Sequence, residues 1–262
     1  MNLMTSSLRQ AMLGAALLVA VAHAQEAAPS ARDLAAQLSD KIQNGSSILR
    51  LKMDISKPGG GKTAYQIRVK SRRAKGSTDL VYQILWPKES KGVSLLLRKS
   101  GGGAPGGALF TPSDSMVTIT AANMRDAIFG SDLSYDDLLE NFFAWEKQAV
   151  VGTETVDRVP CQILESKPGK ADGSGYAKVR SWIDTKRMVT LRVEKYTAAG
   201  KVAKRIDTTQ VTKDDTGNLV GSGYSLRRPG QDSVTEIEGS NSSHGVIFTA
   251  GDFTPDALRT LK

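Results

Sequence analysis

The chain is poor in the residues that carry most enzyme chemistry. Its 262 residues include one cysteine, Cys161, and two histidines, His23 and His244. A single cysteine excludes an intrachain disulfide, and this set is too small for a zinc or iron–sulfur site made of Cys and His. Most nucleophilic and acid–base mechanisms also depend on these residue types. We therefore expect a protein that needs no cofactor and no metal and is not an enzyme.

Long hydrophobic segments are missing as well. The apolar run at 11–22 has 12 residues, whereas a helix needs about 20 to span a bilayer. Arg9 precedes this run and the small residues of Ala22-His23-Ala24 follow it, which is the layout of a cleavable secretory signal. We therefore expect 1–24 to be a signal peptide, 25–262 to form a single domain, and the mature protein to reside in the periplasm.

Basic residues are in excess, with 35 Lys and Arg against 27 Asp and Glu and a formal net charge of +8. They cluster at Arg68, Lys70, Arg72, Arg73 and Lys75, and again at Arg227-Arg228. In a secreted protein this favours anionic lipid head groups over nucleic acid, since each Lys or Arg near such a membrane contributes about 1 kcal/mol. The alternative is a solvated strand edge whose charges prevent pairing with another chain.

Most of the mature chain has the pattern of β-strands. Alternating apolar and polar residues, bounded by Gly, Pro, Asn and Asp, indicate strands. This pattern predicts strands over 49–55, 65–69, 78–86, 92–99, 107–111, 115–120, 145–151, 159–166, 175–184, 188–197, 201–211, 217–228, 232–239 and 245–249.

Three short helices accompany the strands. Ser30 with Asp33 predicts the cap of a helix over 30–42. Ser134 predicts the cap of a second helix, with Asp136 and Asp137 in its first turn. That helix carries one wide apolar face made of Leu138, Leu139, Phe142 and Phe143. A last helix begins at Thr254, with Pro255 at its first position.

This inventory indicates a mainly β (α+β) protein with a large antiparallel sheet. Segments 80–82 and 95–97 are apolar on both faces, and three short helices cannot cover a dozen strands. A strongly curved sheet that forms an incomplete barrel, with helices covering its concave side, would bury these faces. A filled sandwich is the alternative that periodicity leaves open.

Residues 129–138 read Phe-Gly-Ser-Asp-Leu-Ser-Tyr-Asp-Asp-Leu, which resembles the signature of the outer-membrane lipoprotein-sorting protein family, the LolA-like periplasmic carriers. The segments that are similar to the same family are Trp86-Pro87, 91–93, 109–112, 159–165, 176–179, 182–184, 193–196, 200–204 and 248–258. The resemblance covers most of the mature chain, and the glycine-rich segment 101–107 departs from it.

The resemblance implies a half-barrel that binds lipid acyl chains or lipidated protein in a hydrophobic cavity and transfers them between envelope membranes. An inner-membrane exporter or an outer-membrane acceptor would be its protein partner. The alternative is an interaction or regulatory module of the same fold, or an accessory of a membrane exporter, that does not shuttle cargo.

The candidate cavity walls are apolar residues of the first strands and of the second helix. They are Leu51, Met53, Tyr65, Ile67, Tyr82, Ile84, Leu95, Leu97, Leu138, Phe142 and Phe143. Each would serve equally well in an ordinary core.

The family motif supplies a second set of candidates, which we expect to position a lid. These residues are Phe129, Gly130, Ser131, Asp132, Tyr135 and Asp137. Gly130 permits a turn, either Asp132 or Ser134 caps the helix, and Tyr135 packs. Direct contact with a lipid head group is the alternative.

Two enzyme hypotheses have weak support. His244 lies beside Ser242 and Ser243, but the chain lacks the Gly-x-Ser-x-Gly elbow of serine hydrolases. The acidic pairs Asp136-Asp137 and Asp214-Asp215 suggest a glycosidase, yet adjacent acids at a helix start and in a turn are better explained by capping and turn formation.

Overall fold

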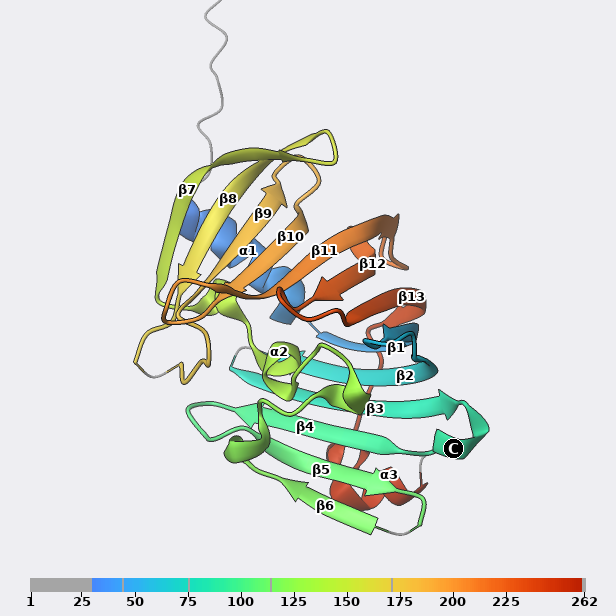
Figure 1. The fold of residues 1–262 in the computed structure, drawn as a ribbon. Helices are drawn as coiled ribbons and strands as arrows, with labels where there is room; N and C mark the ends of the chain where they lie inside the picture. Colours follow the sequence, from blue (N-terminus) through green and yellow to red (C-terminus); the bar gives the residue numbers. More distant parts are fainter. Residues whose placement is uncertain (1–29, 44, 75, 114, 171, 261–262) are drawn as a thin grey trace, which may run out of the picture.

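The computed structural model describes residues 30–43, 45–74, 76–113, 115–170 and 172–260, so the expected signal peptide lies outside the described residues. Within them, 13 strands form one sheet in the order β6-β5-β4-β3-β2-β1-β13-β12-β11-β10-β9-β8-β7 (Figure 1). Neighbouring strands are antiparallel, and β1 pairs with β13 at the centre of the order. Because β6 and β7 are not paired with each other, the sheet is the open, incomplete barrel that the sequence predicts.

The strands fall into two halves. The first half contains β1 (Gly45–Ser56), β2 (Lys62–Ala74), β3 (Ser77–Trp86), β4 (Ser94–Ser100), β5 (Gly106–Thr111) and β6 (Ser115–Ile119). The second contains β7 (Lys147–Val156), β8 (Val159–Lys167), β9 (Lys178–Asp184), β10 (Val189–Tyr196), β11 (Val202–Lys213), β12 (Leu219–Arg227) and β13 (Val234–His244).

Thirteen of the fourteen predicted strands are present, and the prediction of a strand over 245–249 is wrong. The ladder between β1 and β13 continues as far as the Ser47–His244 pair. Gly245 then adopts a φ of +69°, a left-handed conformation that turns the chain out of the sheet.

The helices are α1 (Ala31–Gln43), α2 (Tyr135–Leu139) and α3 (Pro255–Thr260). Single 3₁₀ turns form η1 (Lys88–Ser90), η2 (Ala121–Asn123), η3 (Ile128–Gly130), η4 (Phe142–Ala144) and η5 (Ala250–Phe253). Helix α1 begins as predicted, with the Ser30 hydroxyl accepting a hydrogen bond from the Asp33 amide at 3.2 Å.

The second helix is shorter than predicted, so Phe142 and Phe143 do not extend its apolar face but belong to η4. The helix stops because Glu140 is extended, with φ −70° and ψ 132°. Tertiary contacts hold this break on both sides. Glu140 forms an ion pair with Lys195, and the Asn141 amide donates a hydrogen bond to Ser39 of α1 at 2.8 Å.

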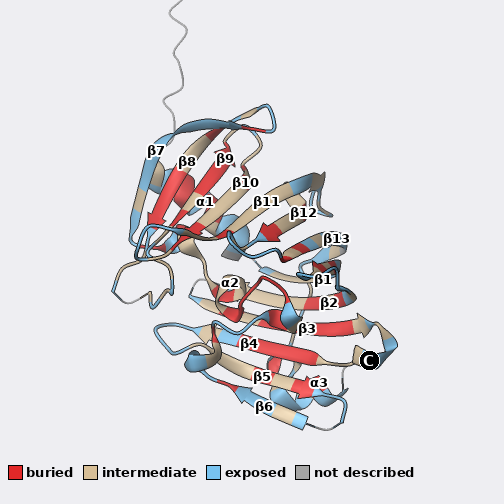
Figure 2. Ribbon diagram, viewed as in Figure 1, coloured by how far each residue is buried: buried red, intermediate tan, exposed pale blue. Residues whose placement is uncertain are grey.

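The two faces of strands β3–β5 pack against different parts of the chain. Alternate residues Leu80, Tyr82, Leu95 and Leu97 lie on the concave side. Val81, Leu96, Ala108 and Phe110 lie on the opposite side, under Phe253 and Leu258 of the C-terminal segment. The expectation that the helices cover the concave side is therefore wrong for α3, which covers the convex side. Figure 2 shows burial concentrated in the inner strands and exposure along the edge strands β6 and β7.

The glycine-rich segment 101–107 connects β4 to β5 and begins β5. A Cβ atom on Gly107 would lie 1.9 Å from the carbonyl oxygen of Leu96, so only glycine allows the two strands to pair this closely. The Gly101 amide also donates a hydrogen bond to the Gly76 carbonyl of the neighbouring hairpin at 2.7 Å. The departure from the family pattern therefore has a local structural role.

Candidate functional site

One segment outside the sheet covers the concave face of the first half. Residues 120–146, which we call the lid, connect β6 to β7 and contain η2, η3, α2 and η4. Figure 1 shows α2 in front of the sheet near β2 and β3, whereas α3 lies behind β4–β6. The lid therefore connects the two edge strands of the open sheet and also covers its concave side.

The lid and the concave strands share one apolar cluster. From the lid it contains Met124, Ile128, Leu133, Tyr135 and Leu139, all buried. Nine of the predicted wall residues belong to it, namely Leu51, Met53, Tyr65, Ile67, Tyr82, Ile84, Leu95, Leu97 and Leu138. The lid fills this face, so in the present conformation these residues form a core.

Phe142 and Phe143 are not part of that cluster. They pack instead with Leu34 and Leu38 of α1 and with Leu164 and Ile183 of the second half of the sheet. Their ring centroids are 4.5 Å apart. The predicted wall set is therefore split between two clusters, one under α2 and one under α1.

The first polar anchor of the lid is Asp132, whose side chain is 1% exposed. Its carboxylate accepts hydrogen bonds from Arg228 Nε at 2.8 Å, from Ser233 Oγ at 2.6 Å and from Thr235 Oγ1 at 3.0 Å. Thr235 also accepts a hydrogen bond from the Asp132 amide at 2.9 Å. Of the two predicted caps of α2, Asp132 is therefore not the cap. It attaches the lid to β13 and to the segment before β13.

The second anchor is Asp137, and it combines a cap with an ion-pair network. Ser134 is the cap of α2, and its amide and hydroxyl each donate to Asp137 Oδ2 at 2.8 Å. Asp137 also lies 2.7 Å from Lys195 Nζ and contacts Lys204 Nζ. Lys195 pairs in addition with Glu140 at 3.1 Å. These contacts attach α2 to β10 and β11.

The charges of this network stabilise one another. Burial alone would raise the pKa of Asp137, but Lys195 and Lys204 outweigh it and hold that pKa well below its ordinary value. Burial alone would lower the pKa of Lys195, whereas Asp137 and Glu140 hold it above its ordinary value. Asp137 and Lys195 therefore both carry their charges at neutral pH, although their side chains are almost completely removed from water.

The rest of the motif shapes the turn before α2. Phe129 and Gly130 both have positive φ, 49° and 77°, which fits the prediction that Gly130 permits a turn. The Phe129 ring lies 6.0 Å from the ring of Tyr65. Ser131 Oγ accepts a hydrogen bond from the Leu133 amide at 3.2 Å, and Tyr135 is buried in the apolar cluster. These contacts hold the turn that precedes α2.

The basic cluster of β2 is divided between the two faces of the sheet. Lys70 pairs with Asp252 at 3.3 Å, Arg72 pairs with Asp79 at 2.8 Å, and Arg68 donates to Gln83. The Arg72 guanidinium also lies 4.7 Å from the Phe253 ring. Lys70 and Arg72 therefore bind the C-terminal segment to the convex face. Lys75 lies outside the described residues.

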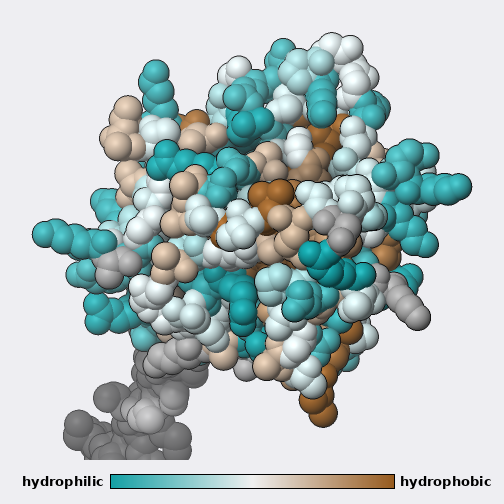
Figure 3. All heavy atoms as spheres, turned by 90° about the horizontal axis from the view of Figure 1, so that it is seen from below, coloured by the Kyte–Doolittle hydropathy of each residue, from teal (hydrophilic) through white to brown (hydrophobic). Residues whose placement is uncertain are grey.

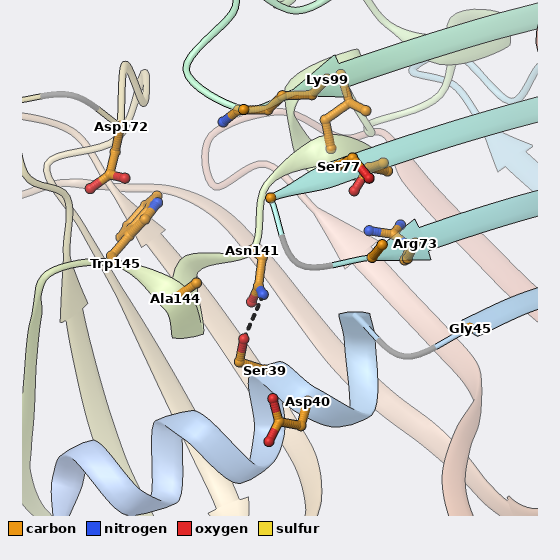
Figure 4. A pocket seen from close by; sticks show the side chains of 15 residues that line it. Ser39, Asp40, Gly45, Arg73, Ser77, Lys99, Asn141, Ala144, Trp145 and Asp172 are labelled. Carbon is orange, nitrogen blue, oxygen red and sulfur yellow. Dashed lines mark hydrogen bonds between the residues drawn. The ribbon is translucent and has the colours of Figure 1, made fainter.

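Arg73 is on the opposite, concave side, in a pocket of about 820 Å³ at one end of the half-barrel. Its wall comes from α1 with the start of β1, the β2–β3 hairpin, the β4–β5 hairpin, the lid between Leu139 and Trp145, and Asp172 between β8 and β9. Figure 4 shows Arg73, Lys99 and Asn141 around this space. The pocket was not predicted, because it combines residues from five separate parts of the chain.

The residues of the enzyme hypotheses have structural partners. The His244 amide donates to Asp215 at 2.8 Å and its ring contacts the same carboxylate, with both side chains more than a third exposed. Asp214 accepts hydrogen bonds from the amides of Thr216 and Asn218, as in an ordinary turn.

Among the described residues, no helix is long and apolar enough to cross a membrane.

Comparisons with known proteins agree with this architecture. A family model described as an uncharacterized protein matches residues 54–260. No curated protein matches the sequence. A DUF1329 family protein from Desulfovibrio piger is similar in structure, with 22% identity, a TM-score of 0.79, and coverage of 87% of this chain and 97% of that one.

Two further solved structures have the same fold. An outer membrane lipoprotein-sorting protein domain from Vibrio parahaemolyticus has 20% identity and a TM-score of 0.75, covering 87% of this chain and 98% of that one. A LolA superfamily protein from Nitrosomonas europaea has 17% identity and a TM-score of 0.69, covering 88% and 100%. The chain therefore belongs to the family of uncharacterized proteins whose model matches residues 54–260, and it has the LolA-like fold of the solved structures.

Proposed function

We propose that this protein is a periplasmic carrier that binds the acyl chains of a lipid or of a lipidated protein on its concave face and transfers them between envelope membranes. The observation that carries the proposal is the arrangement of the lid. It covers a continuous apolar surface, joins none of the sheet's ladders, and is attached through the polar anchors Asp132 and Asp137.

Such a lid is suited to exchange with an acyl chain. Leu133, Tyr135 and Leu139 bury apolar area that a lipid tail would bury in their place, at about 0.8 kcal/mol for each methylene. The sheet would keep all its strand pairings while the lid moves. The cost of moving the lid would fall on its polar anchors and on its own apolar contacts.

The apolar surface is protected in the closed conformation. Figure 3 shows one face of the molecule, on which hydrophilic and neutral residues dominate and hydrophobic residues appear in small groups. A carrier that crosses an aqueous compartment needs this property, because large exposed apolar patches promote association. The Vibrio protein, named as a lipoprotein-sorting domain, has the same fold, which supports the same function here.

The first test is lipid extraction and mass spectrometry of the protein purified without detergent from its native envelope. We expect acyl lipids in a fixed ratio to protein. A fluorescent fatty-acyl probe should bind the delipidated protein with saturation. If no lipid co-purifies and the probe does not bind, the carrier proposal is wrong, and a module that does not shuttle cargo would be favoured.

Substitutions in the lid locate the binding surface. Leu138→Asp and Phe142→Asp place a charge at half-buried positions of the two clusters, so the protein should still fold. We expect each to weaken probe binding at least tenfold. Val117→Asp is the matched control, because Val117 is 55% exposed on the edge strand β6. Equal affinity of all three variants and the unmodified protein would show that these clusters do not contact the acyl chain.

A further inference from the structure

The pocket at the end of the half-barrel is lined by a half-buried cation, Arg73, which has no carboxylate partner among the described residues. Arg73 Nη2 donates a hydrogen bond to the Leu138 carbonyl at 3.0 Å, whereas the buried Nη1 has no hydrogen-bond partner. Burial lowers the pKa of Arg73, and the described carboxylates form no ion pair with it. An unpaired buried charge is strongly unfavourable, so this group favours the arrival of an anion.

The surroundings of Arg73 form a pocket of ligand size. Its volume of about 820 Å³ falls in the range of small-molecule sites, 300–1,000 Å³. Lys99 supplies a second cation from the β4–β5 hairpin, and in Figure 4 its side chain extends over the space. The Asn141 side chain, bonded to Ser39 through its nitrogen, leaves its buried oxygen without a partner in the same wall.

Two acids, Asp40 and Asp172, also belong to the wall, but they lie away from Arg73. Asp40 is exposed on α1, and Asp172 lies beside Trp145, across the space from Arg73 in Figure 4. Asp172 already accepts a hydrogen bond from the Gly169 amide at 2.6 Å. The two acids therefore do not pair with Arg73, and its charge is left without a carboxylate partner among the described residues.

The pocket also adjoins the apolar surface that the lid covers. Leu139 belongs both to the pocket wall and to the apolar cluster, and Arg73 binds the carbonyl of Leu138 next to it. An amphiphile with its acyl chain on the concave face would place its head at this end of the half-barrel.

We propose that the Arg73–Lys99 pocket binds the anionic head group, a carboxylate or a phosphate, of an acyl amphiphile. This inference rests on the carrier function and adds the chemical class of the cargo. The head group would pair with Arg73 Nη1 and with the Lys99 ammonium, while the acyl chain replaces the lid's side chains. Charge-assisted hydrogen bonds of this kind are about twice as strong as neutral ones.

The test compares ligands that differ only in the head group. Titration calorimetry is performed below the micelle concentration with 1-oleoyl-lysophosphatidate, oleate, neutral 1-oleoylglycerol and inorganic phosphate. We expect the two anionic amphiphiles to bind about tenfold to a hundredfold more tightly than 1-oleoylglycerol, since a hydrogen bond to a charged group contributes about 1.5–3 kcal/mol. Inorganic phosphate alone should bind at least a hundredfold more weakly than lysophosphatidate.

Variants separate the head-group site from the lid. Lys99→Gln removes a charge of the pocket without touching the lid carbonyl, and it should reduce the preference for anionic ligands while leaving 1-oleoylglycerol affinity unchanged. Arg73→Gln should abolish the preference, and Arg73→Lys should restore part of it. Lys62→Gln, an exposed site at the far end of β2, is the matched control and should change nothing.

The outcomes distinguish the two proposals. Equal affinity for neutral and anionic amphiphiles, or a preference that survives both Arg73→Gln and Lys99→Gln, would overturn the head-group site and leave the carrier function intact. Absence of binding for every amphiphile would overturn both. Tight binding of inorganic phosphate by itself would assign the pocket to a free anion and reject the amphiphile.

Discussion

The carboxylate of Asp137 lies 2.7 Å from the ammonium group of Lys195, although 58 residues separate them in the chain. The exposed fractions of the two side chains are 1% and 2%. Each charge is therefore stable only because the other is present, together with Lys204 and Glu140. This pair ties the position of α2 to the second half of the sheet, across the concave side.

Removal of one charged partner from the Asp137–Lys195 network should lower the free energy of unfolding. Lys195→Met leaves the buried carboxylates of Asp137 and Glu140 with reduced compensation, and breaking a buried ion pair in this way typically costs about 3–5 kcal/mol. We expect a loss of unfolding free energy of about 3 kcal/mol in urea denaturation. Lys201→Met, an exposed lysine in the turn after β10, is the control and should change stability by less than about 0.5 kcal/mol. Similar curves for both variants would contradict the proposed contribution of the network.

Truncation of Asp132, the other anchor of the lid, should also lower the free energy of unfolding. Asp132→Ala leaves the hydroxyls of Ser233 and Thr235 and the guanidinium of Arg228 without their acceptor. We expect a loss of about 2–3 kcal/mol, because a buried donor without a partner costs about 1–3 kcal/mol. Asp232→Ala removes a neighbouring exposed carboxylate and serves as the control. Faster amide hydrogen exchange in the lid than in β3 and β4 would show that the loss is local to the anchor.

A fall in pH should destabilise the protein through Glu165 of β8 as well as through the carboxylates of the lid. Burial of Glu165 would raise its pKa, but hydrogen bonds from Lys178, Lys167 and Arg180 lower it to about 2. The unfolded chain, with a Glu pKa of about 4.3, takes up protons first as the pH falls. The stabilisation from Glu165 is thus complete above about pH 5 and is lost as the pH falls toward 2.

Thermal unfolding measured between pH 2 and pH 7 checks this expectation. Glu165→Gln should flatten the decline of the melting temperature below pH 5, because the glutamine has no proton to take up. Glu89→Gln, at an exposed carboxylate of η1, should leave the decline unchanged. A Glu165→Gln profile parallel to that of the unmodified protein would refute the assignment.

The C-terminal segment should stabilise the first half of the sheet. Phe253 is fully buried against Val81, Leu96 and Phe110 on the convex face. Phe253→Ala should therefore cost about 3–5 kcal/mol. Ile247→Ala, at a side chain that is 95% exposed in the same segment, should be nearly neutral. Loss of acyl-probe binding is not expected from Phe253→Ala, since Phe253 lies on the face opposite to the lid.

Much of the fold could be predicted because strand alternation is local information. The residue pairs Leu51 and Met53, Ile67 and Val69, and Leu95 and Leu97 each face one side of a strand, and alternation identifies that side directly. The same pattern cannot show what covers the face. Phe142 and Phe143 continue the spacing of α2 and still belong to η4, because Glu140 and Asn141 bind Lys195 and Ser39.

The polar contacts were the least predictable part of the site. Nothing near Asp132 in the sequence indicates Arg228, and nothing near Arg73 indicates Leu138, since both partners are brought together only by the sheet. The ion-pair network does leave one signal in the sequence. The second half carries lysines at positions 195 and 204 where alternation predicts inward apolar residues, which indicates buried partners of opposite charge.

The order of the strands has a mechanical consequence. Since β1 pairs with β13 at the centre, the edge strands β6 and β7 are consecutive in the chain, and the lid connects them. The lid thus spans the distance between the two edge strands. A change in the distance between β6 and β7 would therefore act directly on the lid and on the position of α2.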